Sequence, residues 1–254
     1  MDKLDYLISC LLAERSDLKK ITIPSHSEDK FRLYRTLVNI RPAVPASLGY
    51  LEAEDEYLTL LSHKRGITHI SSLSPIDNGL YLWKGDITSL KCGAIVNAAN
   101  SGMTGCWTAC HNCIDNCIHT FAGIRLRLKC HEIMQAQGHD EPTGQAKITP
   151  AYNLPASFVI HTVGPIVQGP LTEKHCHDLE SSYRSCLDMA CQNNIESLAL
   201  CCISTGVFGF PKHEAARIAV RAARDFLESH DLKIIFNVFS NEDYEIYEQL
   251  LKRY

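Results

Sequence analysis

Residues Leu198–Pro211 have the sequence LALCCISTGVFGFP and indicate the architecture of the whole chain. The first half, up to Ile203, is a continuous apolar run with the length of a buried strand. The second half carries glycines at positions 206 and 209, and a helical pattern follows from His213 to His230. A buried strand that turns through a glycine-containing loop into a helix is the unit from which α/β sheets are built.

The same alternation continues on both sides of this unit. Apolar runs of strand length and segments with helical spacing follow one another from about residue 76 to the C-terminus. We predict further strands at Leu80–Trp83, Ala94–Asn97, Phe158–His161 and Lys233–Phe239, and further helices within Cys113–Gln137, Leu171–Asn193 and Glu242–Lys252. This order predicts an α/β domain over residues 76–254 with a largely parallel sheet, in which ligands bind at the carboxyl ends of the strands.

Residues 1–75 follow a different pattern, in which apolar residues recur at helical spacing and glycine-rich loops are nearly absent. Three such runs begin near Leu4, Phe31 and Leu51. The third is followed by the basic triplet His63-Lys64-Arg65, which is typical of a helix C-terminus. We therefore predict an N-terminal helical extension over residues 1–75, in front of the α/β domain.

Composition limits the classes of function. The chain has 254 residues and a formal net charge of −4, without long blocks of one charge, which disfavours nucleic acid as a partner. The apolar run near the N-terminus is short and broken by acids, and no segment approaches the roughly 18 apolar residues of a membrane span. We expect a cytoplasmic protein without a membrane partner, in which most of the 12 cysteines are small buried side chains.

Three loops that follow predicted strands carry residues suited to a ligand. The turn after Ile203 can cradle a pyrophosphate with its backbone N–H groups, or serve only as a tight strand-to-helix turn. Asp86 can accept hydrogen bonds from a ribose hydroxyl or an exocyclic amine, or cap the next helical turn. Asn97 and Asn100 can bind sugar hydroxyls, or stabilise their own turn. For each loop in isolation, the purely structural alternative is favoured.

The segment from Gly105 to Cys117 contains cysteines at positions 106, 110, 113 and 117 and a histidine at position 111. On a continuous helix the cysteines would form one buried stripe. Cys106 and Cys113 would then lie about 10 Å apart along the axis, too far to share a metal ion. A zinc site therefore requires a loop here, with the helix beginning near Cys113. Three protein ligands and one open position would indicate a catalytic zinc ion rather than a structural one.

Five segments, in this order, together resemble the macrodomain family from about Leu82 to the C-terminus. They are Gly85-Asp86-Ile87-Thr88, Asn97-Ala98-Ala99-Asn100, the stretch Thr143–Pro155, Ile160-His161-Thr162-Val163-Gly164-Pro165, and Ile203–Pro211. The resemblance implies a three-layer α/β/α domain with a mixed, largely parallel central sheet and a binding site for ADP-ribose. The helical extension at the N-terminus is added to this domain.

The resemblance also implies roles for individual residues. Asp86 would bind the adenine amine, with Ile87 beside it and Phe239 packed on the ring. Asn97 and Asn100 would approach the distal ribose. The loop that would wrap the diphosphate consists of Ser204, Thr205, Gly206, Val207, Phe208, Gly209 and Phe210.

One departure from the family pattern points to a particular branch. Hydrolase macrodomains carry a glycine string before the helix, whereas the cysteine-rich segment stands here, which is similar to the zinc-dependent branch. The implied ligands of one Zn²⁺ ion are Cys106, His111 and Cys113. Asp115 lines up with the acid of the ordinary hydrolases, and Asn100 would orient the ribose, so these two are the expected catalytic residues.

The resemblance implies a zinc-dependent hydrolase that removes mono-ADP-ribose from acidic side chains of a modified protein, with O-acetyl-ADP-ribose as a further substrate. The branch is associated with sirtuin-type ADP-ribosyltransferases that modify a lipoyl-carrier protein of the glycine cleavage type, which is the implied partner. The alternative is a non-catalytic reader that binds ADP-ribose without cutting it. Many macrodomains are readers, so the fold does not decide between the two.

Overall fold

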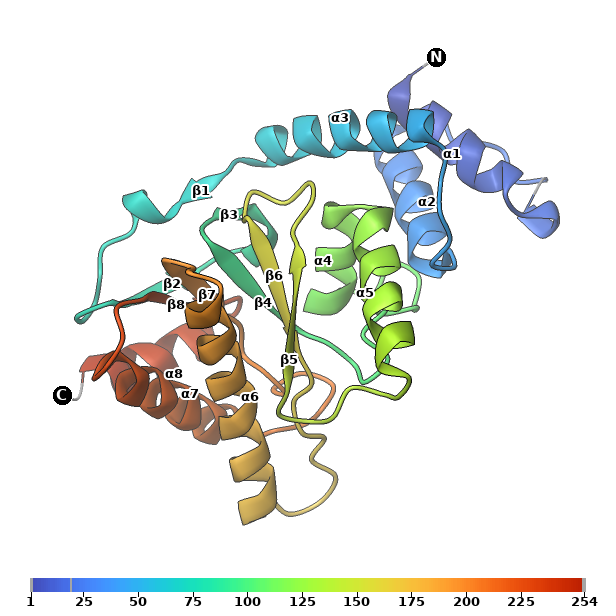
Figure 1. The fold of residues 1–254 in the computed structure, drawn as a ribbon. Helices are drawn as coiled ribbons and strands as arrows, with labels where there is room; N and C mark the ends of the chain where they lie inside the picture. The colour runs from blue at the N-terminus through green and yellow to red at the C-terminus, as the bar shows by residue number, and fades with distance from the viewer. Residues whose placement is uncertain (1, 19, 253–254) are drawn as a thin grey trace.

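The computed structural model describes residues 2–18 and 20–252, which build a six-stranded sheet with helices on both sides (Figure 1). The strands lie in the order β2-β8-β7-β4-β6-β5. They are β2 (Leu80–Lys84), β4 (Ala94–Ala98), β5 (Ala146–Pro150), β6 (Phe158–Thr162), β7 (Ser197–Leu200) and β8 (Lys233–Val238). All neighbours are parallel except β5 and β6, which confirms the mixed, largely parallel sheet.

The helices that connect the strands form the two outer layers. They are α4 (Ile114–Ala122) and α5 (Ile124–Gln137) on one side, and α6 (Glu173–Gln192), α7 (Lys212–Leu227) and α8 (Asn241–Lys252) on the other (Figure 1). The chain moves across the sheet in one direction through α4 and α5 and in the opposite direction through α6 and α7. Because crossovers between parallel strands are right-handed, α6 and α7, which connect parallel strands in the same direction, lie on the same face.

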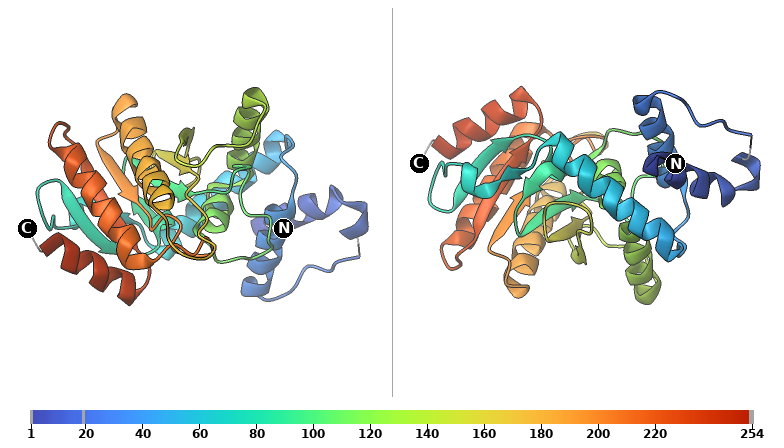
Figure 2. Two further views of the ribbon diagram at one scale, coloured as in Figure 1. Left: turned by 90° about the horizontal axis from the view of Figure 1, so that it is seen from below. Right: turned by 90° about the horizontal axis from the view of Figure 1, so that it is seen from above.

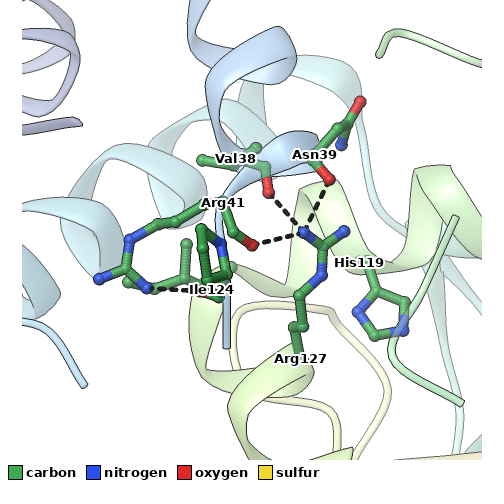
Figure 3. Close-up of a pocket in the computed structure, with 8 residues that line it drawn as sticks. Val38, Asn39, Arg41, His119, Ile124 and Arg127 are labelled. Atoms are coloured by element: carbon green, nitrogen blue, oxygen red, sulfur yellow. Dashed lines mark hydrogen bonds between the residues drawn. The ribbon is translucent and has the colours of Figure 1, made fainter. Parts of the chain in front are cut away.

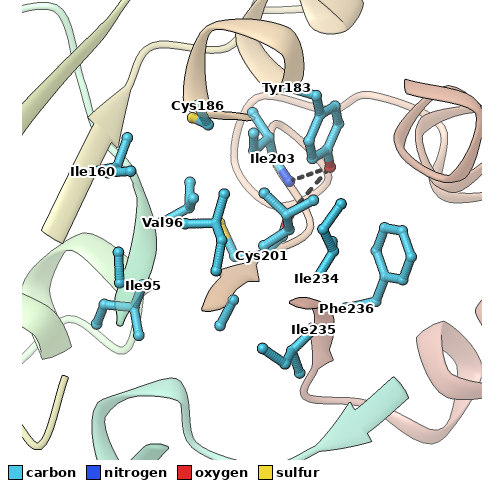
Figure 4. Close-up of a cluster of buried hydrophobic side chains, with 14 of the residues drawn as sticks. Ile95, Val96, Ile160, Tyr183, Cys186, Cys201, Ile203, Ile234, Ile235 and Phe236 are labelled. Carbon is cyan, nitrogen blue, oxygen red and sulfur yellow. Dashed lines mark hydrogen bonds between the residues drawn. The ribbon is translucent and has the colours of Figure 1, made fainter. Parts of the chain in front are cut away.

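A buried core between the sheet and α6 fixes the start of the loop after β7 (Figure 4). Tyr183 of α6 is fully buried, and its hydroxyl donates to Cys201 O at 3.2 Å and accepts from Ile203 N at 3.1 Å. Cys186 and Cys201 are also buried, as expected for cysteines that fill space in a core. The predicted ligand loop therefore leaves the sheet from a rigid base.

Two features differ from the sequence prediction. The helix predicted within Cys113–Gln137 is two helices, because Gly123 has a left-handed φ of 90° that ends α4. An added Cβ at Gly123 would lie 2.6 Å from Glu54 Oε2, so this close approach also requires glycine. Strand β5 was not predicted; it lies at the edge of the sheet, antiparallel to β6, and its sequence AKITP lacks a strong apolar run.

The N-terminal extension consists of α1 (Lys3–Ala13), α2 (Ser27–Ile40) and α3 (Leu48–Arg65), which confirms the predicted helices. Helix α2 packs beside α4, while α3 crosses toward the short strand β1 (Thr68–His69), which pairs with β3 (Leu90–Lys91) (Figure 2). The core of the extension includes Ile124 of α5. Within the described part of the chain, none of the helices has the length and apolarity needed to traverse a lipid bilayer.

Candidate active site

The loop after β7 presents backbone donors at the carboxyl end of the sheet. Ser204 and Gly209 adopt left-handed φ values of 64° and 72°, and Phe210 N donates to Ser204 O at 2.9 Å to close the loop. Gly206 does not need a positive φ, unlike our expectation. No described residue accepts a hydrogen bond from the backbone N–H of Gly206, Val207 or Phe208. These three donors are therefore free to bind an anion.

The side chains of this loop are divided between core and solvent. Phe210 is only 2% exposed and Ser204 is buried, so they anchor the loop, whereas Val207 is 83% exposed. Thr205 Oγ1 donates to Cys202 O at 3.0 Å and stabilises the first turn. The loop therefore exposes its backbone, with its anchoring side chains turned inward.

Asp86 follows β2 and caps the next helical turn, one of the two roles considered for it. Its Oδ1 accepts from Thr88 N at 2.9 Å, so it caps the short helix Ile87–Ser89. Its Oδ2 forms an ion pair with Arg65 at the end of α3, yet the side chain is still 41% exposed. Asp86 can therefore still accept a hydrogen bond from a ligand, although Arg65 already compensates its charge.

The expected adenine residues lie at the same edge of the sheet. Phe239 follows β8 directly, and Gly85 N donates to Val238 O at 3.0 Å, which brings the ends of β2 and β8 together. Phe239 is 81% exposed, so its ring is accessible from solvent. Ile87 is 5% exposed and belongs mainly to the core beneath this edge.

Asp115, at the start of α4, lies in a buried polar network. Asn97 Nδ2 donates to Asp115 Oδ1 at 2.8 Å, and Asn100 Nδ2 donates to Asp115 Oδ2 at 3.3 Å. Burial raises the pKa of Asp115 to about 6, although these two hydrogen bonds oppose the shift. A carboxyl group with this pKa can change its protonation state near neutral pH, which suits acid–base chemistry.

Asn97 connects Asp115 to the buried His161. It is 0% exposed, and its Nδ2 lies 3.1 Å from His161 Nδ1 in addition to its contact with Asp115. Since an amide nitrogen donates, His161 Nδ1 accepts and its Nε2–H faces Thr149 Oγ1 at 2.9 Å. The structure thus differs from the expected contact of Asn97 with a ribose, because this side chain has no exposed surface. Asn100 is half-buried and lies closer to solvent.

The cysteine-rich segment is a loop up to Cys113, where α4 begins, so the helical stripe over Cys106–Cys113 is excluded. The side-chain ligand atoms of Cys106, His111 and Cys113 all lie within 4.8 Å of one another. Cys110 Sγ instead contacts Thr36 Oγ1 of α2 at 3.2 Å. The structure therefore brings together the three residues expected to bind zinc, and Cys110 is not one of this group.

The geometry of this cluster fits a zinc ion. Cys106 Sγ and His111 Nδ1 are 3.6 Å apart, and ligand atoms around tetrahedral Zn²⁺ lie about 3.5–3.8 Å from one another. Cys113 Sγ accepts from Asn116 N at 3.4 Å, a contact that stabilises a thiolate at a helix N-terminus. Burial raises the pKa of the Cys113 thiol to about 12, and a bound dication would reverse this effect. The donor set and spacing are thus compatible with Zn²⁺.

The cluster of Cys106, His111 and Cys113 lies next to the hydrogen-bond network of Asp115. Asn100 Nδ2 donates to Gly105 O at 3.2 Å and to Asp115 Oδ2, so one amide joins the two. Several residues that shape this region were missed in the sequence, namely Arg35, Glu54 and Arg65 of the extension and Arg127 of α5. None of them belongs to a ligand-binding motif. Only Arg65 stood out in the sequence, as part of the basic triplet that we interpreted as the end of a helix.

Known sequences match this chain over nearly its whole length. Residues 96–219 match the Macro domain family. The chain is 51% identical over 252 residues to a Treponema medium protein named protein-ADP-ribose hydrolase, covering 97% of each chain. It is 47% identical to a Staphylococcus aureus protein of the same name, covering 99% of this chain and 96% of the other.

Two solved structures share the fold. The Oceanobacillus iheyensis macrodomain with ADP is 36% identical, has a TM-score of 0.64, and the match covers 71% of this chain and 94% of that one. The Trypanosoma brucei macrodomain in complex with ADP-ribose is 31% identical, with a TM-score of 0.63 and coverages of 85% and 94%. The chain belongs to the macrodomain family.

Proposed function

We propose that this protein is a zinc-dependent protein-ADP-ribose hydrolase that releases mono-ADP-ribose from acidic side chains. The observation that carries the proposal is the convergence of Cys106, His111 and Cys113 beside Asn100 and Asp115. The shared name of relatives at about half sequence identity over nearly the whole chain supports the hydrolase class. Recognition of ADP-ribose alone would not need a three-ligand metal cluster with an open position.

The binding residues hold the reacting end of the substrate in place. The free N–H groups of Gly206, Val207 and Phe208 would bind the diphosphate, and Phe239 and Asp86 would bind the adenine. This energy, gained far from the bond to be cut, keeps the distal ribose in register with the catalytic groups.

The catalytic residues would act on the distal ribose and on water. Asn100 would orient a ribose hydroxyl, and Asp115 would hold or take up a proton, as its pKa near 6 allows. Zn²⁺ bound by Cys106, His111 and Cys113 would supply a Lewis acid or lower the pKa of a bound water toward about 7. Asn97 would fix the position of Asp115 from below.

The proposed substrates share one linkage. ADP-ribose on an acidic side chain and O-acetyl-ADP-ribose both carry an ester on the distal ribose, so one site can act on both. A mono-ADP-ribosylated lipoyl-carrier protein, modified by a sirtuin-type transferase, is the protein substrate that we propose by family resemblance.

The test combines metal content with turnover. Purified wild type is assayed for zinc, and release of ADP-ribose from an acid-linked substrate is followed with and without a chelator. Cys113→Ala should lose both zinc and activity while it still binds ADP-ribose. Cys191→Ala is the matched control and should retain both, because Cys191 is exposed on α6 and lies outside the loop that carries the cluster.

The other results would revise the proposal in defined ways. Full activity without zinc would assign the chemistry to Asp115 and remove the metal from the reaction. Tight ADP-ribose binding without turnover of any linkage would make the protein a reader.

A further inference from the structure

Helix α2 of the extension holds the loop that carries the cysteine and histidine cluster. Arg35 Nη2 donates to His111 O at 2.6 Å and to Asn116 Oδ1 at 2.9 Å, and Nη1 donates to Asn112 Oδ1 at 3.3 Å. A single guanidinium therefore binds the backbone of one proposed zinc ligand and the first turn of α4. The planar fork of arginine can serve these separate acceptors at once.

The next residues on the same face of α2 hold the residue before His111. Asn39 Oδ1 accepts from Cys110 N at 2.9 Å, and Thr36 Oγ1 lies 3.2 Å from Cys110 Sγ. Cys110 has a φ of 53°, a left-handed conformation that costs a non-glycine residue about 1–2 kcal/mol. The contacts with α2 compensate this cost, and the turn at Cys110 sets the direction in which His111 points.

The loop has little support of its own. Between Gly105 and Cys113, the described residues form one backbone–backbone hydrogen bond, from His111 N to Thr108 O at 3.2 Å. In addition, Asn116 Nδ2 of α4 donates hydrogen bonds to Thr108 O at 2.9 Å and to Cys106 O at 3.4 Å. Since Arg35 binds the Oδ1 of the same amide, the support from α4 also depends on α2.

Arg127 joins the end of α2 to the loop a second time (Figure 3). Its Nη1 donates to Val38 O, Asn39 O and Arg41 O at 3.1, 2.7 and 2.8 Å, which satisfies carbonyls at the C-terminus of α2. Its guanidinium also stacks on the ring of Trp107 at 4.2 Å. The cavity at this junction is about 10 Å³, enough for no more than one water molecule, so α2 and α5 are closely packed.

We propose that α2 is part of the metal centre, with Arg35 as the residue that positions the loop from Cys106 to Cys113. The inference rests on the proposed zinc dependence and adds that zinc binding and docking of α2 are coupled. A loop already held in the ligating conformation loses less entropy when it binds a metal. By thermodynamic reciprocity, the bound metal must in turn stabilise α2 on the macrodomain.

The first experiment measures zinc affinity directly, by competition with a chromophoric chelator. Arg35→Met should bind Zn²⁺ about 10- to 100-fold more weakly, the usual loss when a residue that supports a metal ligand is removed. Arg32→Met is the matched control, because Arg32 lies exposed on α2 and its side chain makes no recorded contact within the described residues. It should match wild type within about 2-fold. Both variants should bind ADP-ribose with unchanged affinity in calorimetry, which verifies that the fold is intact.

A conservative substitution of Arg35 and a hydrogen-exchange measurement on the wild-type protein complete the test. Arg35→Lys retains the charge but cannot reach all three acceptors, so its zinc affinity should be intermediate. In wild type, Zn²⁺ should slow amide hydrogen exchange in α2, residues 27–40, while α8 stays unchanged.

The outcomes separate this inference from the proposed function. If wild type binds stoichiometric zinc and Arg35→Met binds it equally tightly, the coupling is wrong and the zinc-dependent reaction stands. If zinc binds but exchange in α2 is unchanged, the reciprocal part is overturned. If wild type binds no zinc, both proposals fall together.

Discussion

Glu54 of α3 is a buried carboxylate that joins the extension to the macrodomain, and its removal should be costly. It is 0% exposed and accepts hydrogen bonds from Tyr34 Oη at 2.8 Å, Tyr50 Oη at 3.0 Å and Ile124 N at 3.0 Å. Glu54→Ala leaves these three donors buried without an acceptor. At roughly 1–3 kcal/mol for each unsatisfied donor, the gross cost is about 3–9 kcal/mol.

Part of this cost is offset. Burial raises the pKa of Glu54, so the wild-type carboxyl group itself carries a desolvation penalty that the alanine variant does not. We therefore expect a net loss of about 3–4 kcal/mol in the free energy of unfolding. Glu54→Gln keeps the shape and one acceptor for Ile124 N, and its amide can donate to the tyrosine hydroxyls, so its loss should stay below about 1.5 kcal/mol.

The assay is urea unfolding at equilibrium, with the slope checked for constancy so that the midpoint reports stability. Hydrogen exchange then locates the effect, which should appear first in α3 and at the start of α5 because Glu54 contacts both. A loss below about 1 kcal/mol in Glu54→Ala, or a larger loss in Glu54→Gln, would refute the view that this carboxylate secures the two parts.

Three further outcomes test other parts of the structure. Asp86→Ala should weaken ADP-ribose binding about 10- to 100-fold in calorimetry, because a hydrogen bond to a charged group contributes about 1.5–3 kcal/mol; unchanged affinity would exclude Asp86 from the site. Gly209→Ala should lower stability to urea by about 1–2 kcal/mol because its φ is left-handed. The added Cβ would also meet Val167 O at 3.0 Å, whereas the Cβ in Gly206→Ala would meet nothing within 4 Å and should be neutral, so equal losses would contradict the loop geometry. Burial lowers the pKa of His161 from 6.5 to about 3, so below pH 6.5 the unfolded chain takes up a proton that the folded protein does not. Stability should therefore fall by about 2 kcal/mol from pH 6.5 to 5 through this residue, and His161→Gln should show a shallower loss in urea unfolding over that window.

The elements that could be predicted are those whose signal is local. Apolar runs such as Leu198–Ile203 and helical spacing such as that near Leu4 depend only on the chain nearby, so five of the six strands of the central sheet and the helices of the extension were predicted. The break at Gly123 was missed because a single glycine inside a helical pattern does not by itself end a helix, and Glu54, which accepts from Ile124 N after the break, lies far away in sequence. Edge strand β5 was missed because it faces a neighbour on one side only.

In the candidate site too, features with a local sequence signal could be predicted and contacts between distant segments could not. The sequence allowed either a helix with a stripe of cysteines or a loop that could bind zinc, and the residue at which the helix begins distinguishes the two. In the structure, Cys113 is the N-cap of α4, so the preceding residues form a loop. The partners of the loop could not be predicted, because Arg35 is an ordinary residue of an amphipathic helix until α2 packs on α4. Asn97 was expected at the ribose because of its place after a strand, but burial and the acceptor on Asp115 turn it inward.

The position of Arg35 on a separate helix has a consequence for engineering of the proposed zinc site and for its evolution. A transplant of residues 105–113 into a macrodomain that lacks α2 would transfer the ligands without the guanidinium that binds His111 O. The minimal transferable unit must therefore be discontinuous, with α2 and the start of α4 included. Over evolutionary time, the residues at positions 35, 39 and 116 should vary together with the sequence of the loop, although positions 35 and 116 are 81 residues apart.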